Sequence, residues 1–151
     1  MVDPHLDVRL VEHPFAAQEA LEQFTARHPE SGGVASFFGL VRPERGVTAL
    51  ELTQYEPLTL PGMEKLAQSA ATRWPLDGLL VWHRIGRMEP GELIVLVAAA
   101  ARHRRAAIEA VDFTMDHLKS ASWFWKREQR GGEWRWIEPR AEDHADLARW
   151  G

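Results

Sequence analysis

Two apolar segments joined by a short turn dominate the middle of the sequence. Residues 79–85 and 92–99 are composed mainly of apolar side chains, and the turn signal Glu89-Pro-Gly91 lies between them. A connection this short favours antiparallel pairing, because parallel neighbours need a crossover of a dozen or more residues. The longest uninterrupted apolar run, residues 93–101, is far shorter than the ~20 residues that a membrane-spanning helix needs. The segments therefore predict an antiparallel sheet in a soluble protein.

Further strands flank this pair. Alternating apolar and polar residues predict strands over residues 6–10, 33–41 and 47–55. The turn signal Pro43-Glu-Arg-Gly46 predicts that the last two strands form a hairpin. A second hairpin, rich in tryptophan, is predicted around the turn Arg130-Gly-Gly-Glu133. Short turns between paired strands are typical of an α+β fold with a mostly antiparallel sheet.

Three amphipathic helices are predicted between the strands, over residues 14–28, 61–73 and 103–121. On the third and longest helix, one apolar face is expected to contain Ile108, Val111, Met115 and Leu118. No linker, low-complexity tract or internal repeat interrupts the chain of 151 residues. We therefore expect residues 1–151 to form a single domain.

The sequence contains no cysteine. Disulfides, cysteine-bound zinc, iron–sulfur clusters and a thiol nucleophile are thereby excluded, so any sulfur chemistry must use sulfur from another molecule. The start of the chain, Met1-Val-Asp-Pro-His-Leu-Asp7, lacks the basic segment and apolar run of a secretory signal and the arginine-rich character of a transit peptide. These features predict a cytoplasmic protein.

Charge is distributed unevenly along the chain. Eighteen Lys and Arg residues against 22 Asp and Glu residues give a net charge of −4. Residues 102–140 hold nine basic and six acidic side chains, a net charge of +3, which leaves −7 on the rest. A duplex-binding surface is normally basic over a whole face, so this distribution favours a local site for a small anion.

Acidic and histidine side chains do not form a recognisable metal motif. Asp112, Asp116 and His117 share one predicted helix, but the sequence has no His-Glu-x-x-His or EF-hand spacing. Acids on an exposed helix face are more often solvated than bound to a metal. We therefore expect neither a metal nor another cofactor.

Cationic side chains are the stronger candidates for chemistry. His103 and Arg104 lie at the start of the predicted third helix, where unpaired N–H groups and the helix dipole attract anions such as phosphate. Cations at that position oppose the dipole, so they hint at a bound anion. The alternative is that they are solvated side chains on an exposed first turn.

Lys119 is predicted in the last turn of the same helix, just before the aromatic run Trp123-Phe-Trp125 and Lys126. An apolar wall and a second cation both disfavour the ammonium form, which would lower the pKa of this lysine toward that of a usable base or nucleophile. The alternative is that Lys119 interacts with the helix dipole and that the aromatic residues belong to the core.

Five short motifs follow one another between residues 6 and 140: Phe37-Phe-Gly-Leu-Val-Arg42, Trp82-His-Arg-Ile-Gly-Arg87 with Pro90-Gly-Glu92, Arg102-His-Arg104, Met115-Asp-His-Leu-Lys119 and Phe124-Trp-Lys-Arg-Glu128. Their order and spacing on a cysteine-free chain resemble the MoaE family, the large catalytic subunit of molybdopterin synthase. The resemblance implies an α/β hammerhead fold with an additional, mostly antiparallel β subdomain. It also implies a homodimer that binds one small ubiquitin-like, MoaD-like subunit at each end.

The resemblance implies a reaction as well. Sulfur arrives as a thiocarboxylate on the C-terminal glycine of the small subunit, and two sulfurs are transferred to cyclic pyranopterin monophosphate to form the dithiolene of molybdopterin. By resemblance, Lys119 is the main catalytic residue and Lys126 assists it. The other residues that the resemblance places at the substrate are Leu40, Val41, Arg42, His103, Arg104, Arg127, Glu128 and Arg140.

The chain departs from the family's pattern in two loops. Leucine stands at position 40, where the family usually carries lysine, so only the backbone of Leu40 is expected to contribute. The loop at residues 43–46 is shorter than is common, and residues 55–61 differ from the usual segment.

Two functions of other classes compete with the enzyme. One is a non-catalytic docking module for a ubiquitin-like partner, against which the presence of Lys119 and Lys126 argues. The other is a single-stranded nucleic-acid binder that stacks bases on the tryptophans. The net charge of −4 argues against nucleic acid as a partner.

Overall fold

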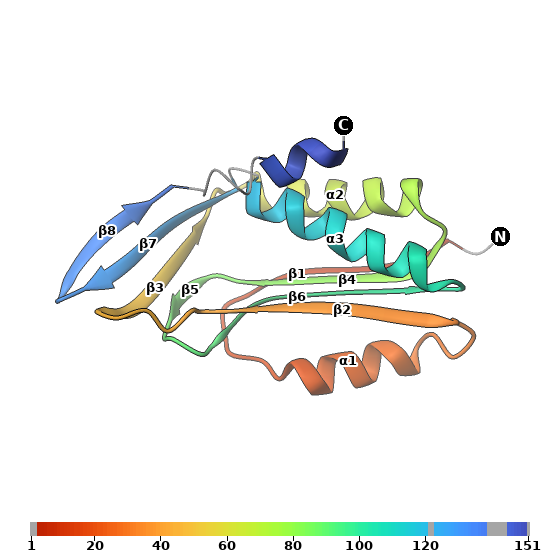
Figure 1. Cartoon of the computed structure of the whole chain (residues 1–151), viewed down its shortest axis with the longest axis horizontal. Helices are drawn as coiled ribbons and strands as arrows, with labels where there is room; N and C mark the ends of the chain where they lie inside the picture. Colours follow the sequence, from red (N-terminus) through yellow and green to blue (C-terminus); the bar gives the residue numbers. More distant parts are fainter. Residues whose placement is uncertain (1–2, 121–122, 139–144, 151) are drawn as a thin grey trace.

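The computed structural model describes residues 3–120, 123–138 and 145–150. Within these ranges the chain forms two four-stranded sheets, with helices on both sides of the first (Figure 1). In chain order, the elements are β1 (His5–Val11), α1 (Ala17–Ala26), β2 (Gly33–Leu40), β3 (Val47–Gln54), α2 (Thr59–Arg73), β4 (Leu76–Arg84), β5 (Gly86–Met88), β6 (Leu93–Ala101), α3 (Arg104–Ser120), β7 (Phe124–Arg130), β8 (Glu133–Ile137) and the 3₁₀ helix η1 (Ala148–Trp150).

Strand β6 lies inside the first sheet, whose strand order is β1-β4-β6-β2. Every residue of β6 after Leu93 is buried, since all are apolar and both faces of the sheet are covered. β6 pairs antiparallel with β4 and with β2, and β1 adds to β4 in parallel. The predicted antiparallel pairing of residues 79–85 with 92–99 is confirmed.

Helices cover both faces of this sheet: α2 and α3 lie on one side and α1 on the other (Figure 1). α1 buries Ala20 and Phe24 against Leu80 and Leu96 of the strands. On the opposite face, α2 and α3 share one larger core with the strands, which includes Met63 of α2. In the part of the chain that the structure describes, no helix is long and apolar enough to cross a membrane.

The hairpin predicted for residues 33–41 and 47–55 is wrong. β2 pairs with β6 in the first sheet, whereas β3 pairs with β5 and β7 in the second. The reason is that β6 is apolar throughout and takes a strand on each of its edges, so β2 joins it. Val41 then bonds to the turn before β6, because its N–H donates to the carbonyl of Glu92 and its carbonyl accepts from the N–H of Gly91.

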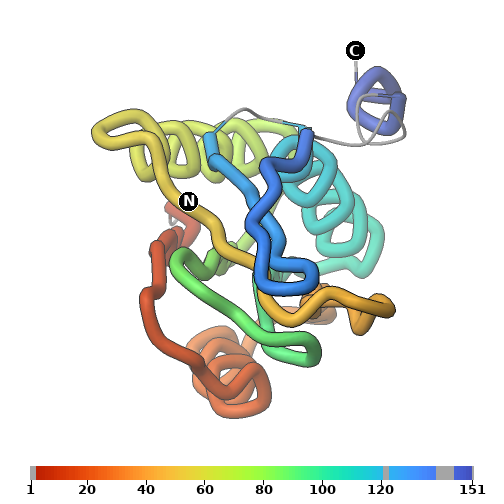
Figure 2. Tube along the Cα trace, turned by 90° about the vertical axis from the view of Figure 1, so that its left-hand side faces the viewer, coloured from red at the N-terminus to blue at the C-terminus, as the bar shows by residue number. Residues whose placement is uncertain are grey.

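The second sheet has the order β5-β3-β7-β8 and lies at one end of the first (Figures 1 and 2). All its pairings are antiparallel, including the tryptophan-rich hairpin of β7 and β8, which confirms that prediction. Gly131 and Gly132 form the turn with φ values of 54° and 82°, a region that suits glycine. The α+β class with an additional antiparallel sheet is also confirmed.

α3 extends along β2 and β6 and contacts both strands. The predicted burial of Val111 and Leu118 is confirmed, but that of Ile108 is wrong, because its side chain is 55% exposed. The buried face contains Ala107 and Ala110, whose small side chains let the helix axis lie close to the sheet. The alanines therefore occupy the inward position, and Ile108 faces away from the core.

Thr59 joins the start of α2 to the segment that leads into β7. Its buried hydroxyl donates to the carbonyl of Trp123 over 2.6 Å and accepts from the N–H of Tyr55 over 2.8 Å. Gly62 also packs closely here, since a Cβ atom at that position would lie 2.7 Å from the Trp123 ring. These contacts fix the place at which β7 begins.

Replacing Thr59 with valine should lower the free energy of unfolding by about 1–3 kcal/mol, because the change keeps the shape but leaves buried polar groups without their partner. Thr72→Val is the matched control: the Thr72 hydroxyl donates to the carbonyl of Gln68 at an exposed position, so its loss should cost about 0.5 kcal/mol or less. Urea unfolding measures both. Equal losses would contradict the role of Thr59.

Candidate active site

α3 places Lys119 at the end of the first sheet that lies beside the second sheet (Figure 1). Lys119 is in the last turn of the helix and is exposed. The preceding residue, Leu118, is buried in the same core cluster as Val81 of β4 and Val95 of β6. The C-terminal turn of α3 is therefore anchored in the core that the helix shares with the first sheet.

His83 is buried near the end of β4, within range of the charge on Lys119. Its Nδ1 lies 2.8 Å from the carbonyl oxygen of Arg84, so Nδ1 carries the proton and donates it. Its ring stacks on Phe124, with centroids 4.1 Å apart and planes 18° apart. Burial, with a smaller contribution from the positive charge of Lys119, lowers the pKa of His83 to about 3. The ring is therefore neutral near pH 7.

The charged side chains of β7 lie on both faces of the strand. Because side chains alternate along a strand, Lys126 and Glu128 share a face with Phe124, whereas Arg127 lies on the other face. Lys126 is two residues from Phe124, whose ring is stacked on the imidazole described above. The structure thus brings Lys126 to the same end of the first sheet as Lys119.

Arg127 is held on the outer face of the second sheet. Its Nε donates to Oε1 of Glu51 over 2.7 Å, and its guanidinium carbon lies 4.4 Å from the centre of the Trp134 ring. These partners come from β3 and β8, the strands on either side of β7. Arg127 and Lys126 therefore lie on opposite faces of the sheet.

A chain of ion pairs connects Arg42 with Glu128. Arg42 lies 3.6 Å from Glu44, Glu44 lies 3.2 Å from Arg130, and Arg130 lies 3.0 Å from Glu128. The Arg42 side chain remains 69% exposed and is thus accessible to an anionic ligand. The pairs link the loop after β2 to β7.

The two residues before Arg42 differ in their surroundings. The side chain of Leu40 is exposed and lines a shallow apolar cavity of about 350 Å³ beside Phe15 and Phe38. Val41 is buried in the core, and both its backbone groups are used by the turn at Gly91 and Glu92.

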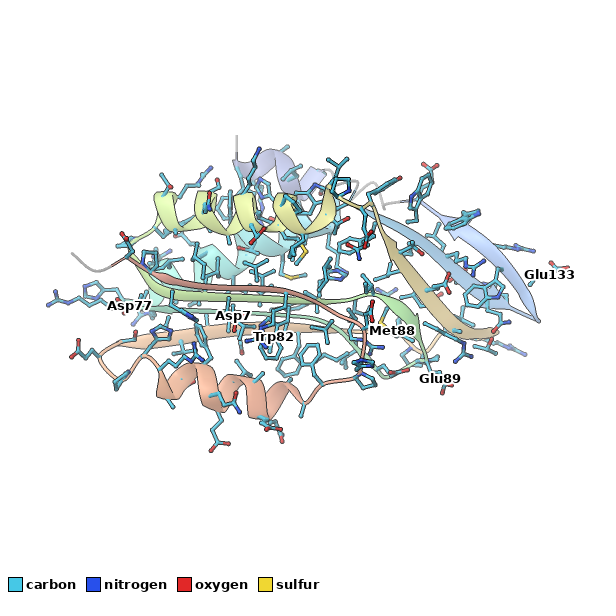
Figure 3. The ribbon with its side chains drawn as sticks, turned by 180° about the vertical axis from the view of Figure 1, so that it is seen from behind. Asp7, Asp77, Trp82, Met88, Glu89 and Glu133 are labelled. Atoms are coloured by element: carbon cyan, nitrogen blue, oxygen red, sulfur yellow. The ribbon has the colours of Figure 1, made fainter. Side chains whose placement is uncertain are left out.

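His103 and Arg104 are exposed and lie at the opposite end of the molecule. Arg104 begins α3, where its backbone packs against Gly33, and Lys119 is 15 residues further along the same helix. At 1.5 Å per residue, about 22 Å separates their backbones. Figure 3 labels one residue near each end of the molecule. Asp77 follows Leu76, which pairs with Ala101 just before α3, and Glu133 lies in the hairpin of β7 and β8 at the other end.

The remaining predicted site residue, Arg140, lies outside the described residues. Asp112 and Asp116, considered above as metal ligands, both accept from Arg149. Asp116 also accepts from the indole N–H of Trp150 over 2.6 Å. In the described ranges, no three His, Asp or Glu side chains are grouped as a metal site would require. The structure thus gives these acids a role in holding the C-terminal segment against α3.

Sequence reasoning did not single out His83 or the pairs of Glu44 and Arg130. His83 was visible only as part of the motif Trp82-His-Arg-Ile-Gly-Arg87. Strand alternation would have placed it on the same face as Leu79 and Val81, which predicts a buried histidine. Its neighbour Phe124 belongs to the other sheet, and strand alternation does not predict that contact.

The fold and the site define a class: a small α+β protein with two lysines at the junction of two sheets and no sulfur nucleophile of its own. Comparison with known proteins agrees. A family model described as "MoaE protein" matches residues 10–121. The chain belongs to the MoaE family.

Relatives cover nearly the whole chain. The molybdopterin synthase catalytic subunit of Caulobacter vibrioides is 46% identical over 144 residues, which is 95% of this chain and 96% of the relative. The solved molybdopterin cofactor biosynthesis protein E of Burkholderia multivorans is 38% identical, with a TM-score of 0.82 and 97% of each chain covered. A Helicobacter pylori complex of subunits 1 and 2 of molybdopterin-converting factor matches in fold, with a TM-score of 0.77 at 20% identity, over 88% of this chain and 91% of that one.

The neutral, buried His83 predicts a specific loss of stability in acid. Its pKa is 6.5 in a solvated chain and about 3 in the fold, so between these values the unfolded chain binds a proton that the folded chain does not. The free energy of unfolding should therefore fall as the pH falls through this window, with up to about 1.4 kcal/mol per pH unit from this group. Urea unfolding at pH 4 to 7 measures the slope. His83→Gln cannot titrate and should show a shallower slope, whereas an unchanged slope would contradict the assignment.

Proposed function

We propose that the chain is the catalytic subunit of a molybdopterin synthase, a sulfurtransferase of molybdenum cofactor biosynthesis that acts in the cytoplasm. Sulfur comes from the C-terminal thiocarboxylate of a small ubiquitin-like subunit and is transferred to cyclic pyranopterin monophosphate, which becomes molybdopterin. The proposal is supported by two lysines in a MoaE-family chain without cysteine: Lys119 lies in the last turn of α3, and Lys126 lies near the start of β7, whose first residue Phe124 stacks on His83 of the other sheet.

The two lysines have the main chemical roles. Lys119 is exposed at the end of α3 and acts as the base or nucleophile, while Lys126, on the Phe124 face of β7, assists in proton transfer or orientation. Among the other residues, Arg42 is accessible and cationic and so binds the phosphate or pterin, and Glu128 lies beyond Lys126 on the same face. We keep Arg140 and the backbone of Leu40 as substrate contacts, with Arg127 at the edge of the site. Val41 is buried and both its backbone groups are hydrogen-bonded to the turn before β6, so it supports Leu40 and Arg42 rather than contacting the substrate.

A second copy of the chain completes the site. His103 and Arg104 bind the phosphate in this proposal, but the length of α3 keeps them about 22 Å from Lys119 of their own chain. A partner copy that presents the start of its α3 to this Lys119 removes the conflict. β2 supports such an assembly, because it is an edge strand with an exposed Phe37 and Phe38, each 45% accessible.

The small subunit is the second partner. The Helicobacter pylori structure is a complex of two subunits of molybdopterin-converting factor, and this chain has the same fold as the chain it matches. We infer that a MoaD-like subunit brings its C-terminus to the end of α3, and that two copies of each subunit form a heterotetramer. No nucleic acid or membrane takes part in this proposal.

Reconstitution tests the proposed function. Purified protein is mixed with a thiocarboxylated MoaD-like subunit and cyclic pyranopterin monophosphate, and molybdopterin is measured. The proposal predicts product that depends on all three components. Binding of the small subunit without product would instead identify a docking module.

Lys119→Ala should abolish product formation in this assay, and Lys119→Arg should fail almost as completely. Guanidinium keeps the positive charge, but it does not deprotonate to act as a base or nucleophile near neutral pH. Calorimetry should show that both variants still bind the small subunit, since one exposed side chain rarely carries a whole interface. Near-normal turnover by Lys119→Arg would mean that only charge is needed at this position.

Arg104→Ala should raise the KM for the cyclic phosphate about tenfold while kcat changes little, because a phosphate contact is present in both ground and transition states. Arg105→Ala is the matched control: its side chain is 84% exposed and pairs with Glu109 of its own helix. Steady-state kinetics should leave the control unchanged. A fall in kcat at constant KM for Arg104→Ala would indicate a catalytic role instead.

The protein alone should be a dimer with twice the 17.2 kDa mass of the chain. Light scattering at micromolar concentration measures this mass directly. Introducing a charge on the exposed edge strand, as in Phe37→Glu, should shift the mass toward that of the monomer, because burial of an unpaired carboxylate opposes association. A monomeric wild-type protein would contradict the shared site.

A further inference from the structure

His83 has no role in the reaction as proposed above, yet it contacts the strand that carries Lys126. The imidazole belongs to β4 of the first sheet, and Phe124, on which it stacks, is the first residue of β7 in the second sheet. Their centroids are 4.1 Å apart and their planes nearly parallel, at 18°. The stack thus joins the two sheets at the start of β7, two residues before Lys126.

The imidazole cannot turn freely. Its Nδ1–H donates to the carbonyl of Arg84 over 2.8 Å, and only 4% of the residue is exposed. A ring held by a hydrogen bond and by burial offers Phe124 one fixed surface. Because Lys126 follows Phe124 by two residues on the same face of β7, the ring, together with the pairing of β7 to β3 and β8, fixes the position of Lys126.

The neutral ring of His83 leaves the charges of the nearby lysines undisturbed. α3 brings Lys119 to this end of the sheet, β7 brings Lys126 and Glu128, and α2 brings the uncharged Thr59 to the segment before β7. A cation at position 83 would repel the lysines, and a carboxylate would pair with them and hold them protonated. A neutral aromatic ring does neither.

We propose that His83 is a positioning residue: its fixed ring holds Phe124, and with it the start of β7, where Lys119 and Lys126 act on the same substrate. The inference rests on the proposed function, since it gives His83 an effect on sulfur transfer through these two lysines. His83 itself exchanges no proton in the reaction.

Three variants test the proposal in the reconstituted assay with the small subunit and the cyclic phosphate. His83→Leu stays neutral and apolar but loses the ring, and it should lower kcat by about 10- to 100-fold with little change in KM, as expected for displaced catalytic groups. His83→Phe restores a ring and should recover most of kcat. Val81→Ala, fully buried two residues earlier on the same face of β4, is the control for lost stability and should keep kcat while it is folded.

The outcomes distinguish a failure of the positioning role from a failure of the proposed function. Normal kcat in His83→Leu, or an equal loss in Val81→Ala at matched melting temperature, would overturn the positioning role. The pH profile of kcat is a further check: a limb between pH 5 and 8 that disappears in His83→Phe would make His83 an acid or base and would also overturn it. Absence of product from the wild-type protein would instead count against the proposed function.

Discussion

Burial of β6 on both faces is the constraint on which the rest of the structure depends. A strand of apolar residues needs a partner on each edge and a cover on each face, and β4, β2, α1 and α3 supply them. α3 follows β6 directly and returns along the sheet. Its two ends therefore lie at the two ends of the sheet, which fixes Arg104 at one and Lys119 at the other.

The same constraint explains where the second sheet lies. β2 is taken by β6, so β3 leaves the first sheet and pairs with β5 and β7 at the end where α3 stops. The two sheets meet at the stack of His83 on Phe124, and the hydrogen bond from Thr59 to Trp123 ties the segment before β7 to α2. Lys119 lies at the end of α3 and Lys126 near the start of β7, while the carboxylates of Glu44 and Glu128 are paired with arginine.

Much of the fold could be predicted from the sequence because it follows from local periodicity. The pairing across Glu89-Pro-Gly91 and the tryptophan-rich hairpin depend on short turns, and both are confirmed. The predicted hairpin of residues 33–41 and 47–55 is wrong because β2 pairs instead with β6, a strand far away in the sequence. The predicted burial of Ile108 is wrong because alanines, whose small side chains add little to an apolar pattern, occupy the inward face of α3.

The sequence suggested the individual residues of the candidate site, but not that they lie at two different ends of the molecule. Sequence spacing placed His103, Arg104 and Lys119 on one helix, and helix geometry then keeps the first two far from the third. The contact of His83 with Phe124 joins residues 41 positions apart on different sheets, which no local pattern indicates. What the sequence does not contain is the arrangement of one element against another.

The central claim is that one site uses Lys119 of one copy and Arg104 of the other. Hybrid dimers of Lys119→Ala with Arg104→Ala, isolated with two different affinity tags, test it when the substrate is kept below the wild-type KM. In a shared site, one of the two sites in each hybrid has both residues intact, so the hybrid should recover about half of the wild-type rate. If both residues serve the same chain's site, every site in the hybrid lacks one of them, and a rate no higher than the average of the two parent variants would contradict the account.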